Sequence, residues 1–532
     1  MLHKNNTSVT NVITGFLGPG ITAVVSYMKI SPRMVSMLQR TTLVFIALLL
    51  TVFLLAFPPN GYIGIHGFKY AAFLVICGGY VLVIAVVRIM HAVKGVQPIG
   101  KNSFMQLPLA VKCLIGFLFF TILSALFSSY PGAFLGGGRQ EGALTIVIYV
   151  MCCVFVSLYF KPHKWMIYLL GIVTVFTNML ALVQLTGRNP FNLYPGGFNF
   201  HDAGVHYGGE FLSTIGNSGL YAGFLVIVIG VFALALTKFE EEIRWLAAVP
   251  FFLCVLVAFA MQTDAALMAI LVGTVLIIPV AATNRKALSN MMMVFAIILG
   301  AFALSRVLIF QAGPVGFAPV PVVLVAGVGV MALVSELVMK ISLFEMIPAR
   351  WYRIGAAVVM FGSIAIALVY LWTYSGGPGG IIYEASQVLR GNWEDDFGNH
   401  RIFIWREVLE RIRWGTLLLG TGPDTMVHWD IPPFVRHTDY FTVISRIDSA
   451  HNEFLHVLAM GGLLSLAAYL GAVLTALFSW VRRPDNALSA MSGAGVLFYL
   501  IQSVFGISHF SSAPFFWVCL GVLVNADVQK HS

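Results

Sequence analysis

Long apolar runs, separated by short polar segments, fill most of this 532-residue chain. Their usual length is about 20 residues, which is what an α-helix needs to cross the hydrocarbon core of a bilayer. The pattern therefore predicts an all-α fold, a polytopic bundle of about 12–14 transmembrane helices. The candidate spans are 41–57, 70–90, 108–127, 143–160, 165–186, 214–237, 245–261, 265–282, 291–310, 316–338, 354–372, 452–480, 490–506 and 513–524.

One polar interruption, residues 373–451, is much longer than the others. The pattern divides the chain into an N-terminal tail (1–40), a transmembrane bundle (41–372), the long loop (373–451), C-terminal transmembrane helices (452–525) and a short tail (526–532). The N-terminal tail is weakly amphipathic, which is typical of a segment at a membrane surface. It lacks the apolar core and small-residue cleavage site of a signal peptide, so we expect no cleaved leader.

Composition supports the same fold class. The chain is 59% hydrophobic and only 10% charged, with a mean hydropathy of +0.89, whereas a soluble domain has about 25% charged residues. This excludes a water-soluble globule. The six cysteines all fall inside apolar runs, so neither a disulfide framework nor a zinc site is indicated. The net charge of +9 is expected from cations that flank membrane spans, and nucleic acid is not an expected partner.

The distribution of Lys and Arg predicts the orientation. When the N-terminus is placed in the cytoplasm, the short outside loops hold only Lys69, Arg139, Arg188 and Arg306, and most other cations lie inside. Cytoplasmic loops carry the positive excess in membrane proteins. We therefore expect a multi-pass protein of the cytoplasmic membrane, with both termini cytoplasmic and the 373–451 loop extracytoplasmic. That side has no ATP or nucleotide sugars, so chemistry there needs a donor that is already activated and carried by the membrane.

Three short polar segments at the expected outer ends of spans are candidate sites. The loop G-G-G-R-Q-E-G (136–142) presents Arg139, whose planar guanidinium suits a diphosphate or carboxylate, although a plain tight turn is the alternative. Asn217 opens a span where free backbone N–H groups favour an anion; a simple helix cap is the alternative. At 262–264, the expected structure is a turn in which Asp264 caps the next helix.

The long loop contains a predicted amphipathic helix. Its apolar positions recur at helical spacing, with charged residues on the other side. We expect this helix to lie on the outer face of the membrane, with Arg401 at the border of its apolar stripe. The apolar positions are Ile402, Trp405, Val408, Leu409 and Ile412, and the charged ones are Arg406, Glu407, Glu410 and Arg411.

His451 stands at the mouth of the span that follows this loop. An imidazole in that position is available as a base near pH 7, and a polar cap is the alternative. Asn452 and Glu453 lie next to it, and the same loop presents arginines. Because ionisable groups at membrane depth are usually functional, the pattern favours a site here.

These motifs together resemble a known family. Arg401-x-x-x-Trp405, the G-T-G-P turn, and A-H-N-E-F-L (450–455) followed by G-G (461–462) are similar to the signature of the O-antigen ligase and polysaccharide polymerase superfamily. The G-G-R-Q-E-G loop and a G-N-S motif at Gly216 are also similar to bacterial members. The resemblance covers about residues 110 to 480 in order, and the pairing of R-x-x-x-W with A-H-N-E is its most specific part.

The resemblance implies a GT-C-like, metal-independent membrane glycosyltransferase that uses no cofactor. Its donor would be a glycan on a polyprenyl diphosphate, usually undecaprenyl diphosphate, and its acceptor a glycan or glycolipid hydroxyl, with membrane lipid around both. His451 would be the catalytic base and Arg401 the diphosphate binder, since fixed cations can stabilise the charge of that leaving group. The further substrate-binding candidates are Arg139, Asn217, Trp405, Asn452 and Glu453.

The sequence departs from this family pattern at one turn. Many relatives place an arginine in an S-R-G-like motif at a mid-chain outward turn, where this chain has Thr263-Asp264-Ala265. An acidic residue cannot bind phosphate there. We expect Arg139 to supply the second cation; a different donor position or an altered activity are the alternatives.

Other functions remain open at this stage. Polymerase and ligase activities differ in the acceptor, which the sequence does not identify, and transfer to protein hydroxyls is known in the same superfamily. A glycan transporter or lipid flippase also fits the number of spans. Transporter sites tend to lie near the midplane on broken helices, whereas the polar groups here gather at one outer face. A non-catalytic scaffold for envelope assembly is the remaining alternative.

Overall fold

The computed structural model describes residues 32–93, 107–195, 201–202, 205–206, 212–239, 241–309, 316–317, 322–437, 442–483 and 486–528. Residues 1–31 of the predicted N-terminal tail and 529–532 of the C-terminal one lie outside this range. The described parts of both predicted tails, 32–40 and 526–528, are helical. Helix α3 already begins at Pro32, and α22 continues to Val528.

Ten helices of the described residues are long and apolar enough to cross a membrane, which confirms a polytopic helical bundle. Four shorter apolar helices fall on the remaining predicted spans. The long ones are α3 (Pro32–Leu48) with η1 (Leu49–Phe53); α4 (Ile65–Phe73), η2 (Leu74–Gly78) and α5 (Gly79–Val93) as one rod; α7 (Leu109–Leu126), α9 (Lys164–Leu185), α10 (Ser218–Lys238), α11 (Glu241–Met261), α14 (Arg285–Val307), α15 (Val322–Lys340), α16 (Ala349–Thr373) and α20 (Glu453–Arg482). The shorter ones are α8 (Ala143–Tyr159), α12 (Asp264–Leu276), α21 (Ala487–Ser503) and α22 (Ala513–Val528).

The remaining elements are short. Strands in the described part of the chain occur only as three antiparallel pairs, and the longest of these lies in the loop before α20. The short helices are η3 (Pro190–Asn192), α13 (Ile278–Ala281), η4 (Ser342–Glu345), α17 (Ile381–Leu389), α18 (Phe397–Arg411), α19 (Trp414–Leu417) and η5 (Met426–His428). The strands are β1 (His201–Asp202), β2 (Val205–His206), β3 (Leu308–Ile309), β4 (Gly316–Phe317), β5 (Phe434–His437) and β6 (Thr442–Ser445).

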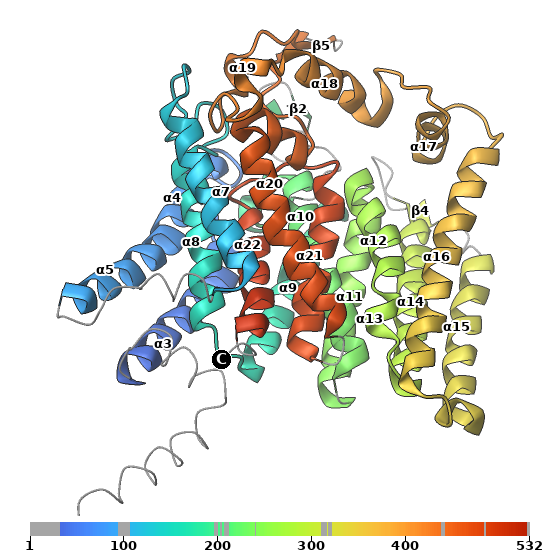
Figure 1. The fold of residues 1–532 in the computed structure, drawn as a ribbon. Helices are drawn as coiled ribbons and strands as arrows, with labels where there is room; N and C mark the ends of the chain where they lie inside the picture. The colour runs from blue at the N-terminus through green and yellow to red at the C-terminus, as the bar shows by residue number, and fades with distance from the viewer. Residues whose placement is uncertain are drawn as a thin grey trace, which may run out of the picture.

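Helix α10 is the centre of the bundle. Of the residues in its 18-residue apolar stretch, 89% are buried inside the protein. The helix packs against α11, α12 and α21 (Figure 1). A Cβ atom at Gly230 would lie 2.5 Å from the carbonyl oxygen of Ala494 on α21, so a larger residue cannot fit. Small residues let helix backbones approach closely inside a membrane. Gly230 therefore allows the close packing of α10 against α21.

Helices α15 and α16 form one edge of the bundle (Figure 1). In the 18-residue apolar stretch of each helix, only 11% of the residues of α15 and 6% of those of α16 are buried inside the protein. Val323 is 82% exposed and Phe361 64% exposed, among many other large apolar side chains on these helices. A continuous apolar surface of this extent is unsuited to water and matches a lipid environment.

Lys69 lies inside α4 and not in a short outside loop, contrary to the sequence prediction. Its side chain is 1% exposed. The ammonium group donates hydrogen bonds to the carbonyl oxygens of Phe53 (2.6 Å) and Leu54 (3.1 Å) at the end of η1. A cation is favourable at the C-terminal end of a helix, where carbonyl groups lack partners. Lys69 is thus a structural cap and says little about orientation.

The long loop is a folded layer across one end of the bundle. Figure 1 shows α17, α18 and α19 there, beyond the end at which α20 begins. Thr421 and Gly422 of this layer donate backbone hydrogen bonds to the carbonyl oxygens of Ala459 (3.3 Å) and Met460 (2.9 Å) in α20. The G-T-G-P turn therefore docks directly on the helix.

Gly462 breaks α20 where that turn docks. Its backbone has φ 77° and ψ 177°, a region that is essentially restricted to glycine. A Cβ atom at this position would lie 2.3 Å from the carbonyl oxygen of Leu418. The second glycine of the G-G motif is therefore needed for the kink and for the close approach of the 418–422 turn.

We expect Gly462→Ala to lower the thermal stability of the purified protein clearly, by about 1–3 kcal/mol or more, because of the strained φ and the clash with Leu418. Gly355→Ala in α16 is the matched control, since a Cβ atom there meets nothing within 4 Å. It should be neutral or slightly stabilising. Equal melting temperatures for the two variants, measured in the same detergent, would refute this role of Gly462.

Candidate functional site

Asp424 joins two loops that are far apart in the sequence. Its carboxylate accepts hydrogen bonds from the backbone N–H groups of Gly138 (3.0 Å), Arg139 (2.9 Å) and Glu141 (3.3 Å). The Asp424 side chain is almost fully buried. Charge-assisted bonds to several N–H groups are strong and directional. The 136–142 loop is thus wrapped around one carboxylate of the long loop.

Arg139 is held in position by this arrangement and by an ion pair. Its Nη2 atom lies 2.8 Å from Oδ1 of Asp448, and each side chain is about one quarter exposed. The Nε atom of Arg139 is buried without a hydrogen-bond partner among the described residues. Arg139 is therefore fixed next to the segment that leads to His451, with donor capacity to spare.

Helix α18 brings Arg401 to the same segment. Trp405 donates a hydrogen bond from its indole Nε1 to the carbonyl oxygen of Ala450 (3.0 Å). Arg401, one turn earlier, donates from Nη1 to the carbonyl oxygen of Gly398 (2.8 Å), and its Nε has no partner among the described residues. Burial lowers the pKa of Arg401, and the nearby carboxylates of Asp264 and Glu384 oppose that shift.

The apolar stripe of α18 differs from the sequence prediction in what it contacts. Ile404 and Val408 are buried against Met426 of the long loop and Ala459 of α20. Leu409, assigned to the stripe, is 56% exposed. The helix is amphipathic as predicted, but protein covers the face that was expected to lie on the membrane.

The charges of Arg139 and Arg401 both act on His451. Burial lowers the pKa of its imidazole to about 4, and the positive charges of Arg139 and Arg401 act in the same direction. Asp448 opposes them only partly. His451 also has a left-handed backbone (φ 46°), which is uncommon for a residue with a side chain. The imidazole is therefore neutral near pH 7, and it stands on an uncommon backbone conformation.

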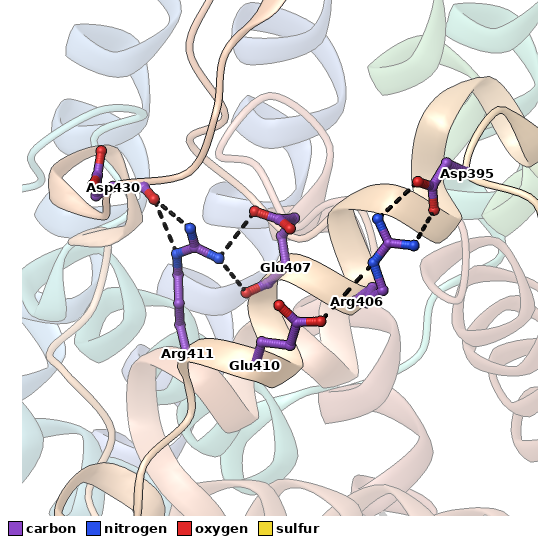
Figure 2. A network of polar contacts seen from close by, with 6 residues as sticks. All are labelled: Asp395, Arg406, Glu407, Glu410, Arg411 and Asp430. Atoms are coloured by element: carbon purple, nitrogen blue, oxygen red, sulfur yellow. Dashed lines mark hydrogen bonds and ion pairs between the residues drawn. The ribbon is translucent and has the colours of Figure 1, made fainter.

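The other arginines of α18 belong to a separate surface network (Figure 2). Arg406 pairs with Asp395 (2.7 Å) and approaches Glu410, whereas Arg411 pairs with Glu407 (3.0 Å) and donates to the carbonyl oxygen of Asp430. These cations already have anionic or carbonyl partners on the outer side of the helix. Arg401 of the same helix, in contrast, acts electrostatically on His451.

Glu453 faces the interior of the bundle, and Asn452 caps α20. Glu453 is buried and accepts hydrogen bonds from Tyr469 (2.8 Å) and Ser503 (3.1 Å). The Asn452 side chain accepts from the backbone N–H of Leu455 (3.0 Å), so it is the N-cap of α20. Both residues fix the start of α20, directly after His451.

Asn217 and Asp264 behave differently from each other. Asn217 caps α10 by accepting from the backbone N–H of Leu220 (3.0 Å), as the alternative interpretation predicted. Asp264 was expected to cap α12, but it lies inside the first turn, and the N-cap residue Thr263 makes no side-chain cap. Asp264 instead supports the charge of Arg401. The departure from the family pattern is thus an acid that neighbours a candidate phosphate-binding arginine.

A cavity of about 70 Å³ lies beneath the Asp424 bonds. Glu141, Asp424, Glu453 and His456 all line it. Glu141 accepts a hydrogen bond from Tyr149 (2.8 Å), and burial raises the pKa of its carboxyl group to about 8. Glu141 is therefore protonated near pH 7.

Sequence reasoning missed the residues that position the arginines. Asp424, Asp448 and Glu141 were not among the predicted site residues, although all lie in segments that the motifs singled out. Asp424 directly follows the G-T-G-P turn, and that position is the one signal that could have found it. In the described part of the chain, no group of three or more His, Cys, Asp or Glu side chains is arranged to hold a metal ion.

Comparisons with family models and with curated proteins found no match. No family model matches the chain, and no curated protein matches it either. The fold defines the class as a multi-pass helical membrane protein, and the site must be interpreted from its own geometry.

We expect the stability of the protein to fall as the pH rises from about 4.5 to about 8, in part because of Glu141. Its pKa is raised in the folded state, so the folded protein binds the proton more tightly than the unfolded chain in that window. Glu141→Gln keeps the shape and stays neutral, so it should flatten this part of the melting-temperature profile by a few degrees. Identical pH profiles for the wild type and the variant would contradict the assignment.

Proposed function

We propose that this protein is a membrane glycosyltransferase that moves a glycan from a polyprenyl diphosphate to an acceptor hydroxyl. The observation that carries the proposal is a neutral His451 on whose pKa the charges of both Arg139 and Arg401 act, in a segment that Arg139 reaches through Asp448 and α18 through Trp405. The resemblance of the R-x-x-x-W and A-H-N-E motifs to the O-antigen ligase and polysaccharide polymerase superfamily points to the same activity. On this proposal, the site faces the extracytoplasmic side.

In this mechanism the two arginines bind the diphosphate. A guanidinium presents several N–H donors in a planar fork that matches phosphate oxygens. As the glycosidic bond to the diphosphate breaks, negative charge grows on the leaving oxygen, and fixed cations stabilise it. Buried Nε atoms of both arginines without a partner among the described residues support this role.

His451 acts as the general base in the same step. It accepts the proton of the acceptor hydroxyl while that oxygen attacks the anomeric carbon, and the diphosphate leaves with the bonding electrons. A base with a pKa near 4 is weak, but the low value is due in part to the charges of Arg139 and Arg401. A bound diphosphate neutralises those charges, so donor binding raises the pKa of His451 toward its ordinary value and strengthens the base.

We expect His451→Ala and Arg401→Ala to lower glycan transfer by about 100-fold or more while the protein still inserts in the membrane. Arg401→Lys should also fail, because a point charge cannot replace the planar fork. Arg406→Lys is the matched control, since Arg406 is exposed and pairs with Asp395 on the other face of α18. The assay follows release of polyprenyl diphosphate and the new glycosidic bond in vesicles.

The outcomes separate the alternatives. Full transfer by the His451 or Arg401 alanine variant removes that residue from the mechanism. Movement of the lipid-linked glycan across the bilayer without a new glycosidic bond would instead indicate a transporter.

The pH dependence should show the coupling between donor and base. His451 must be neutral to accept a proton, so the rate falls as the pH drops through its pKa. The acid limb of kcat/KM reports the free protein, with a pKa of about 4, and the limb of kcat reports the donor complex. We expect the kcat limb to lie at the higher pH. Arg139→Gln removes one positive charge and should move the kcat/KM limb upward; coincident limbs, unchanged in this variant, would refute the coupling.

A further inference from the structure

A second polar cavity, of about 320 Å³, lies at the end of the bundle opposite the candidate site. Residues of α10, α11, α14 and α15 line it. Asp264, at the start of α12, is near Arg401, and the chain then runs through α12 and α13 to the other end, where α14 begins. Arg244 in the first turns of α11 and Lys286 at the start of α14 mark this end. The cavity is thus separate from the residues proposed for glycan transfer.

The cations and the amide in the lining of this cavity supply hydrogen-bond donors. Arg244 donates from Nη1 to Oδ1 of Asn290 (2.7 Å), which turns the amide so that Nδ2 is a free donor. Asn290 is only 5% exposed, and its Nδ2 atom has no partner among the described residues. Lys286 adds an exposed ammonium group. Within the described residues, no carboxylate lines the cavity, so its chemistry complements an anion with several acceptor oxygens.

The two serines in the lining are already satisfied. Ser289 and Ser335 hydrogen-bond to each other (2.8 Å) and to each other's carbonyl groups, which joins α14 to α15. A buried amide donor without a partner is costly in an apolar surrounding. Asn290 is therefore the group in the lining whose hydrogen bonding a ligand would complete.

The rest of the lining is apolar and continues toward the middle of the bundle. Met293 and Ile297 lie about one and two turns beyond Asn290 on the same helix. At the other extreme, Trp245 is 57% exposed beside the guanidinium of Arg244. Tryptophan at this position is typical of the interface between membrane and water. The cavity thus has a cationic mouth at the interface and an apolar interior, which suits an amphiphile and not a free ion.

We propose that this cavity binds the phosphate headgroup of an anionic membrane phospholipid from the leaflet opposite the glycan site. Basic pockets between transmembrane helices bind such headgroups. The phosphate oxygens accept from Lys286 and Asn290 Nδ2, the charge of Arg244 lies next to them, and the start of an acyl chain lies along Met293. Because α15 and α16 are mostly exposed, a lipid wedged between α11, α14 and α15 also helps to hold this edge to the bundle.

The test measures lipid retention by the full-length protein in detergent, with native mass spectrometry. Phosphatidylglycerol is titrated against phosphatidylcholine of the same chain length. Lys286→Glu and the isosteric Asn290→Asp place negative charge at the phosphate, and each should weaken phosphatidylglycerol retention about tenfold. Arg350→Glu changes an exposed cation at the same end, outside the cavity, and should retain the lipid like the wild type.

A second measurement separates a lipid from a free anion. Phosphatidylglycerol should raise the melting temperature of the wild type but not that of Asn290→Asp. Millimolar inorganic phosphate should neither raise the melting temperature of the wild type nor displace the lipid. Equal retention of the two lipids, or wild-type retention by both cavity variants, would overturn the proposal. If inorganic phosphate alone displaced the lipid, the cavity would be a site for a free anion, and the proposal of a lipid ligand would fail. These results do not depend on glycan transfer, so the two proposals can fail separately.

Discussion

The candidate site depends on the hydrogen bonds that the Asp424 carboxylate accepts. Three backbone N–H groups of the 136–142 loop converge on it, and they come from a part of the chain almost 290 residues earlier. Arg139 cannot reach Asp448 unless this loop is in place. The same turn is tied to α20 through Gly422 and Met460, and α20 begins beside His451. The Asp424 carboxylate thus connects the loop of Arg139 to α20, at the end of the helix that His451 precedes.

Electrostatics gives this end of the molecule its character. Two guanidinium groups act on one imidazole, and Asp448 and Asp264 each balance one of them in part. Burial keeps His451 neutral, and the two guanidinium groups act in the same direction, because an imidazolium ion would be unfavourable both away from water and among cations. Arg406 and Arg411, on the outer face of α18, are instead saturated by their own partners (Figure 2). Arg139 and Arg401 differ from these two in that each has a buried Nε atom without a partner among the described residues.

Sequence predicted the bundle well and the details of the site less well, for a physical reason. Hydropathy reports the environment of each residue locally, so every predicted span falls on an apolar helix. Hydrogen bonds across hundreds of residues leave no local signal, which is why the role of Asp424 was not predicted. Lys69 is a similar case: a cation before an apolar run indicates a loop, unless carbonyl groups of another helix receive it. The single polar residues Asn217 and Asn452 are helix caps in the structure, and their type alone could not distinguish a cap from a ligand-binding group.

Backbone strain gives evidence for the site that is independent of any resemblance. Residues with side chains rarely adopt positive φ, and the strain persists only where the surroundings impose it. Among the described residues, six of the nine such positions lie at or within two residues of a site residue: Gln140, Gln262, Asn399, His400, Asp424 and His451. The turn at 399–400 directly precedes Arg401, and Gln140 directly follows Arg139. The surroundings therefore constrain the backbone next to Arg139 and Arg401 and at His451, which is consistent with the site proposed there.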